Sequence, residues 1–171
     1  MYQVTNANVY IDGSNMIGTV KEMQLPNVEF TQAEHKALGM IGTVNYFAGI
    51  EAMEASITWS TILPDTIKTL GNPRKAVNLT LYSNLEVVDT GSGLTEEQKI
   101  TTVIRGFIKG FPLGTYTPGE EASDVTTAMA IHYIKQTSAA GDAIEVDVFN
   151  NTFIVNGEDL LADYNGNIQF S

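Results

Sequence analysis

The chain contains no cysteine, and this absence excludes several kinds of chemistry at once. Disulfides, thiol nucleophiles and thiolate metal sites all need cysteine, so stability has to come from packing or from assembly. Cations are also scarce, with nine Lys and Arg residues against twenty Asp and Glu residues and a net charge of -11. Because such a surface repels phosphate, ordinary nucleic-acid recognition is not expected.

Histidine is almost absent as well, and the two positions argue against a metal cluster or a proton relay. His35 lies in a polar segment, and His132 lies inside a predicted strand, where a satisfied structural role is expected. Residues 163–167 begin like a calcium loop, but the glycine required at the sixth position is Ile168. We interpret this segment as a C-terminal turn and expect no metal and no cofactor.

Long hydrophobic runs are missing too. No apolar run approaches the length of a membrane span, and the first residues lack the basic flank and apolar core of a signal peptide. We therefore expect a protein that folds in the cytosol and has no membrane span. With 171 residues, 43% of them hydrophobic and 17% charged, the composition predicts one globular domain over residues 1–171.

What the sequence does contain is a succession of strand signals. Residues 53–60 alternate strictly, with Met53 and Ile57 on the apolar side and Glu54 on the polar side. Asp12-Gly13 supplies the residues of a tight hairpin turn. Further strands are predicted at residues 77–82, 100–111, 125–135 and 144–148. The fold class that fits is mainly β, an antiparallel β-sandwich or barrel with one short α-helix.

Two segments differ from these strands. Residues 64–70 predict the short helix, because Pro64 lies at its start, Asp65 in its first turn and Gly71 just after its end. Residues 31–46 are polar and then Gly-rich without a convincing period, which predicts a long extended hairpin arm. The buried side of the chain changes parity at Pro26, so we expect a bulge or kink there.

Carboxylate pairs are the nearest thing to a catalytic site. Glu51 with Glu54, or Glu145 with Asp147, could form a hydrolase pair, but both pairs are predicted on regular strands without partner groups. A solvated or lumen-facing strand surface is the better interpretation. We expect no catalytic residues, and an enzyme is the least supported class.

Aromatic residues leave a different alternative open. Trp59, Phe107, Phe111 and Tyr133 could line a ligand cavity, as in small β-barrels, although core packing is their commoner use. The alternative function is therefore a monomeric β-barrel or sandwich that binds a ligand or sugar.

Short motifs, in the same order from end to end, resemble the major tail tube protein of contractile-tailed bacteriophages and of phage-tail-like bacteriocins. They lie at residues 8–13, 25–26, 39–40, 49–54, 144–150 and 156–161. The chain departs from the family's usual two glycines at Leu38-Gly39-Met40, and its segment at 83–99 is longer than usual.

The resemblance implies a tail-tube barrel that assembles into six-membered rings, stacked as a hollow tube inside a contractile sheath. The implied partners are further copies of the chain, the sheath protein, baseplate and tail-terminator proteins, and a tape-measure protein in the lumen. DNA would pass without specific binding. The implied location is the tail of a virion or bacteriocin, assembled in the host bacterial cytoplasm.

The arm is the expected contact between subunits and between rings, because it has little core of its own. The predicted interface residues are Pro26, Glu34, Lys36, Gly39, Met40, Glu51 and Glu54. Glu145 and Asp147 are candidates for facing the lumen, where an acidic wall would repel a DNA backbone. The sequence leaves open whether the particle carries DNA or is a DNA-free bacteriocin or injector.

Overall fold

The computed structural model describes residues 2–60, 64–88, 91, 94–110, 113–115, 117–118 and 125–170. These residues form antiparallel β-structure with two short helices, so the mainly β fold class is confirmed. Most strands belong to one ten-stranded sheet, whose main path runs in the order β12-β11-β10-β9-β8-β7-β1-β2. The bounds are β1 Tyr2–Ile11, β2 Ser14–Asn15, β7 Val77–Val88, β8 Thr95–Gly110, β9 Thr126–Ser138, β10 Gly141–Asp147, β11 Thr152–Val155 and β12 Glu158–Asp159.

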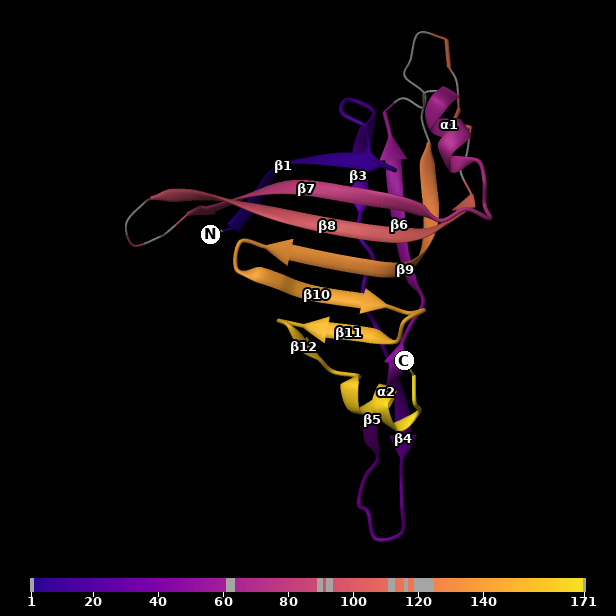
Figure 1. Cartoon of the computed structure of the whole chain (residues 1–171), viewed down its shortest axis with the longest axis vertical. Helices are drawn as coiled ribbons and strands as arrows, with labels where there is room; N and C mark the ends of the chain where they lie inside the picture. Colours follow the sequence, from indigo (N-terminus) through magenta and orange to yellow (C-terminus); the bar gives the residue numbers. More distant parts are fainter. Residues whose placement is uncertain are drawn as a thin grey trace.

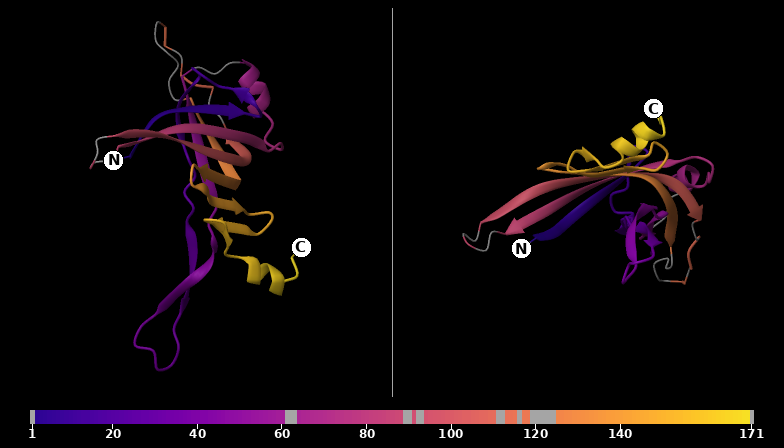
Figure 2. Two further views of the ribbon diagram at one scale, coloured as in Figure 1. Left: turned by 60° about the vertical axis from the view of Figure 1, so that its left-hand side comes forward. Right: turned by 90° about the horizontal axis from the view of Figure 1, so that it is seen from below.

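The remaining strands of this sheet, β3 (Val20–Gln24) and β6 (Met53–Trp59), branch from its path at β9. Residues 126–131 of β9 pair with β6, whereas residues 133–138 pair with β10 along the same edge. Because β9 changes partner, it bends, and β3 and β6 pass across the strands of the main sheet (Figure 1). Seen from below, β3 and β6 lie on one side of the sheet and the C-terminal segment lies on the other (Figure 2).

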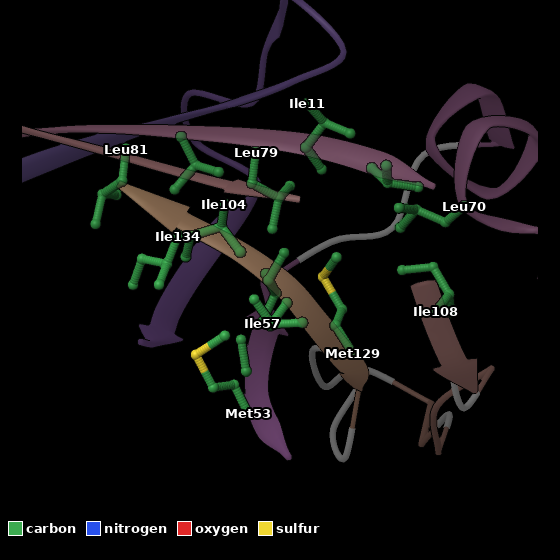
Figure 3. Close-up of a cluster of buried hydrophobic side chains, with 14 of the residues drawn as sticks. Ile11, Met53, Ile57, Leu70, Leu79, Leu81, Ile104, Ile108, Met129 and Ile134 are labelled. Carbon is green, nitrogen blue, oxygen red and sulfur yellow. The ribbon is translucent and has the colours of Figure 1, made fainter. Parts of the chain in front are cut away.

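The core fills the space between β6 and the main sheet (Figure 3). Ile11, Ile57, Leu79, Ile104 and Met129 are at most 1% exposed, and they come from five different strands. Burying each such side chain contributes roughly 1.5–3 kcal/mol to stability. The alternation predicted for residues 53–60 is confirmed, since the four apolar side chains of β6 are at most 4% exposed.

The tight turn predicted at Asp12-Gly13 joins β1 to β2, which pair antiparallel. Asp12 has φ 45° and Gly13 has φ 84°, as a type I′ hairpin turn requires. Asp12 also accepts a hydrogen bond at 3.0 Å from the backbone N–H of Asn78, at the start of β7. The turn is thereby fixed to the neighbouring strand.

The predicted arm is a hairpin of β4 (Phe30–His35) and β5 (Val44–Ile50), which form a two-stranded sheet of their own. It projects away from the body, at the end opposite to α1 (Figures 1 and 2). The bulge expected at Pro26 is instead a break: β3 ends at Gln24, and residues 25–29 belong to no strand. Pro26 is buried there. Because proline has no backbone N–H to donate, it suits a link between strands better than a position in a hydrogen-bonded strand pair.

Helix α1 spans Pro64–Leu70 as predicted, and Leu70, at 2% exposed, anchors it to the core. A second helix, α2 (Ala162–Asn167), occupies the segment interpreted as a C-terminal turn, so the expectation of a single helix was wrong. No side chain caps α2 and none of its residues is buried. The usual sequence signals of a helix are therefore lacking.

Candidate assembly interface

The tip of the arm, between β4 and β5, exposes two large aliphatic side chains. Leu38 and Ile41 are fully exposed, and Gly39 between them has φ 87°, a conformation that glycine tolerates best. The backbone N–H of Met40 closes the tip by donating to the carbonyl oxygen of Ala37 at 3.1 Å. Aliphatic side chains held out on a projecting hairpin are typical of a contact surface.

The structure gathers four of the seven predicted interface residues on the arm. Glu34 lies on β4, and Lys36, Gly39 and Met40 lie at the tip. The other three, Pro26, Glu51 and Glu54, lie at the base of the arm or in the body.

Glu51 and Glu54 do not form a pair on one regular strand, contrary to expectation. Glu51 lies in the two-residue link between β5 and β6, where its backbone N–H donates to the carbonyl oxygen of Glu29 at 2.9 Å. The Glu54 carboxylate, on β6, forms an ion pair with Lys109 of β8. The alternating pattern predicted the strand of Glu54 correctly. Glu51 lies before the start of this strand at Met53, so the two carboxylates do not share it.

An apolar groove of about 720 Å³ lies at the base of the arm. We call it the basal groove and define it by Phe30 and Phe47 of the arm together with Phe153, Leu160 and Tyr164. The ring centroids of Phe30 and Phe47 lie 5.7 and 6.4 Å from that of Phe153. Phe30 and Phe47 are nevertheless about half exposed, at 47% and 51%. Sequence reasoning missed this groove, because tertiary contact alone unites its two sides.

Charged side chains form a connected network on β9 and β10. Lys135 contacts Asp142 at 2.8 Å and Glu145 at 3.1 Å, and Glu145 also accepts a hydrogen bond from the Tyr133 hydroxyl at 3.1 Å. The guanidinium of Arg105 lies 5.0 Å from the centre of the Tyr133 ring. Hydrogen bonds to the two carboxylates raise the pKa of Lys135 above its usual range, so the lysine stays charged.

The two predicted lumen-facing acids therefore both have partners. Glu145 is half-buried and paired with Lys135. Asp147 accepts hydrogen bonds from the backbone N–H groups of Phe149 and Asn150, at 3.0 and 3.2 Å, and from the Asn150 side chain at 2.7 Å. Asp147 thus stabilises the turn after β10. Glu145 of β10 forms an ion pair with Lys135 of the neighbouring strand β9.

His132 lies between two phenylalanine rings, with centroid distances of 5.3 Å to Phe107 and 4.6 Å to Phe149. Its Nδ1 atom is buried without a hydrogen-bond partner among the described residues, so this atom is not satisfied as expected, although the ring packs between aromatic neighbours. Burial lowers the pKa of His132, although the Asp147 carboxylate acts in the opposite direction. The ring serves mainly as packing material for its aromatic neighbours.

The aromatic residues weighed as a cavity lining are dispersed. Trp59 is buried in the core, whereas Phe107 is half-buried against His132 and Tyr133 is half-buried in the charged network. Phe111 lies outside the described residues. Trp59, Phe107 and Tyr133 do not line the basal groove, so these three give no support to the observation that motivated a ligand-binding barrel.

The described part of the chain lacks both a metal-binding cluster and a membrane-spanning helix. It contains no group of three or more His, Asp or Glu residues placed to hold a metal ion. No helix in it is long and apolar enough to cross a membrane.

Comparisons with known proteins agree with this picture. A family model described as phage tail tube protein FII matches residues 2–168. The tail tube protein of Escherichia phage P2 is 25% identical over 165 residues, which cover 94% of this chain and 93% of that protein. A solved structure, the PVC sheath/tube terminator of an extracellular contractile injection system in the extended state, superposes with a TM-score of 0.53. That match covers 79% of this chain and 95% of the other at 10% identity, and supports the fold alone.

Proposed function

The chain belongs to the phage tail tube protein FII family, and we propose that it assembles into hexameric rings that stack as a hollow conduit. It is a structural tail tube protein of a contractile system rather than an enzyme. One observation carries the finer proposal. The arm projects from the body, and the Leu38 and Ile41 side chains at its tip are fully exposed, so no side chain among the described residues covers them.

Ring formation is supported by an open sheet edge. Strand β1 pairs with β7 along one edge, but along its other edge only Tyr10 and Ile11 pair, with β2. In the described part of the chain, no strand pairs with residues 2–9 of β1 along this edge, although the Val9 carbonyl oxygen accepts from the Met16 N–H and the Ala7 N–H donates to the Asn6 side chain. An exposed edge favours pairing with another chain, and a closed ring removes the exposed edge from every copy. The resemblance to the tail tube family implies that each ring contains six copies of the chain.

The conduit would lie inside a contractile sheath in the tail of a phage or phage-like particle. A chain with a net charge of -11 lets DNA slide without binding, because its surface repels phosphate. We expect the sheath protein, baseplate and tail-terminator proteins, and a tape-measure protein in the lumen as partners. Assembly would take place in the host bacterial cytoplasm.

Negative-stain electron microscopy of the purified full chain, across a concentration series, tests this proposal. We expect six-fold rings at low concentration and hollow tubes at high concentration, because ring stacking is a mass-action equilibrium. A chain that stays monomeric at every concentration would contradict the proposal. Rings with another symmetry would refute the hexamer while keeping the tube.

A further inference from the structure

We propose that the basal groove of one copy receives the α1 surface of a second copy stacked head to tail. We define the α1 surface by Ile17, Lys68, Arg74 and Lys75. This inference rests on the proposed stacking of rings and adds a second contact to that of the arm. The contact would fix how far one ring is rotated relative to the next.

The two surfaces lie at opposite ends of the molecule. Helix α1 and the turn between β2 and β3 lie at one end, and the arm with its base lies toward the other (Figures 1 and 2). The Thr66 hydroxyl of α1 contacts the sulfur of Met16 at 3.9 Å, which holds the turn containing Ile17 beside the helix. Copies stacked along the direction of the arm therefore bring the α1 surface of one toward the groove of another.

The C-terminal segment beside the groove carries acids and no cations. After Lys135 the sequence contains no Lys or Arg, whereas Glu158, Asp159 and Asp163 flank the groove residues Leu160 and Tyr164. Glu158 and Asp163 have no ion-pair partner among the described residues, and all three acids are exposed. This side of the groove therefore presents an unbalanced negative charge.

The α1 surface carries three cations. Lys68, Arg74 and Lys75 lie within eight consecutive residues and account for three of the nine cations of the chain. Lys68 and Lys75 have single carboxylate partners, Asp65 and Asp12, in exposed pairs that contribute little to stability. The guanidinium of Arg74 has no partner in the described part of the chain.

The apolar parts of the two surfaces also correspond. Ile17 is 74% exposed on the turn that Met16 holds beside α1, the helix of Lys68, while the basal groove is apolar and is flanked by acids. Stable interfaces have this arrangement of an apolar centre with a polar rim of complementary charge. A second copy is thus an occupant that matches the groove in both charge and polarity.

Charge reversal tests the contact on the full chain. The cation-reversed protein carries Lys68→Glu and Arg74→Glu, and the acid-reversed protein carries Glu158→Lys and Asp163→Lys. Each should raise the concentration needed for tube formation by at least about tenfold, because each places like charges together. Combining all four substitutions should restore assembly. The acidic residues Glu120, Glu121 and Asp124, which lie outside the described residues, are not substituted in any of these variants.

A matched control separates local pairing from net charge. It combines the cation reversal with Glu96→Lys and Glu97→Lys on β8, which gives the same net charge as the fourfold variant but places the new lysines far from the groove in the sequence. This control should remain defective. The cation-reversed and acid-reversed proteins should also form tubes when mixed, because each supplies the surface that the other lacks.

Pelleting and electron microscopy give the result, and circular dichroism with Trp59 fluorescence verifies that each variant is folded. Single reversals that assemble like the wild type would overturn the contact, as would a fourfold variant that stays defective although folded. In both cases wild-type tubes would leave the proposed function intact. A wild-type chain that never forms tubes would instead refute the proposed function and this inference together.

Discussion

The indole Nε1 of Trp59 donates a hydrogen bond at 2.9 Å to the hydroxyl of Thr127, and both side chains are at most 2% exposed. The bond joins β6, which crosses the sheet, to the bent strand β9. Trp59 is the only tryptophan, so its fluorescence reports on the junction between the two layers. A buried donor needs its acceptor, because an unsatisfied polar group loses hydration without compensation.

Substitution Thr127→Val should therefore lower the free energy of unfolding by about 1–3 kcal/mol, since valine keeps the shape but leaves the indole N–H unpaired. Thr126→Val is the matched control, because Thr126 is exposed and bonds only to the exposed hydroxyl of Thr58. Urea unfolding followed by Trp59 fluorescence measures both. Equal losses for the two variants would show that the buried bond has no special importance.

Strand β8 approaches β9 closely at Gly106, where the register between the two strands shifts. A methyl group there would lie 2.7 Å from Ile131 Cδ1 and nearer still to the carbonyl oxygen of Ala130. Gly106→Ala should thus cost about 1–3 kcal/mol through overpacking. Gly110→Ala, on the same strand, meets nothing within 4 Å and should be nearly neutral. Thermal unfolding followed by circular dichroism compares the two variants. An unchanged unfolding midpoint for Gly106→Ala would show that β8 and β9 can move apart at this position without loss of stability.

Some of this fold follows from local sequence alone. Strict alternation predicts β6 and its buried side, because a strand repeats every two residues whatever its partners are. Pro64 and Gly71 predict the bounds of α1, because both act through the backbone of their own segment.

Other features depend on contacts that no local pattern records. The alternation of β9 indicates a strand but not that its partner changes from β6 to β10 along one edge. The basal groove exists because Phe153 meets Phe30 and Phe47 of the arm. Helix α2 has neither a capping side chain nor a buried residue, so neither signal for a helix was available.

Asp12 should make stability depend on pH in the acid range. Partial burial acts to raise the pKa of Asp12, but hydrogen bonds from the Asn78 backbone and Lys75 outweigh it, so the pKa lies below its usual value. A carboxyl group with a lowered pKa stabilises the fold above its unfolded-state pKa, which is about 3.9 for Asp. That contribution is lost as the pH falls through the folded-state pKa.

Asp12→Asn should therefore lower the urea midpoint at pH 7, and the difference from the wild type should shrink as the pH falls below about 4. Asp65→Asn is the control, because the Asp65 side chain is 91% exposed and its ion pair with Lys68 contributes little. A difference between wild type and Asp12→Asn that stays constant down to pH 2 would show that the ionised form is not what stabilises the turn.

The arm should be needed for stacking but not for folding. All six residues of β4 are exposed and the arm forms a sheet of its own, so replacing residues 31–46 by an Asn-Gly turn removes little of the core. We expect a folded protein, with cooperative unfolding monitored by Trp59, that forms no tubes in electron micrographs. Normal polymerisation of this protein would rule out the arm as the contact between rings.

A finer variant separates the apolar tip from the length of the arm. Leu38→Ser with Ile41→Ser keeps both strands but removes the two fully exposed aliphatic side chains, so the fold should keep its stability while tube formation falls. Leu94→Ser, which changes a 68% exposed leucine just before β8, is the matched control. If removing apolar area from the tip costs several kcal/mol per subunit contact, the concentration needed for assembly rises more than about tenfold. Tubes that form equally well from both variants would show that the strands of the arm, rather than its tip, make the contact.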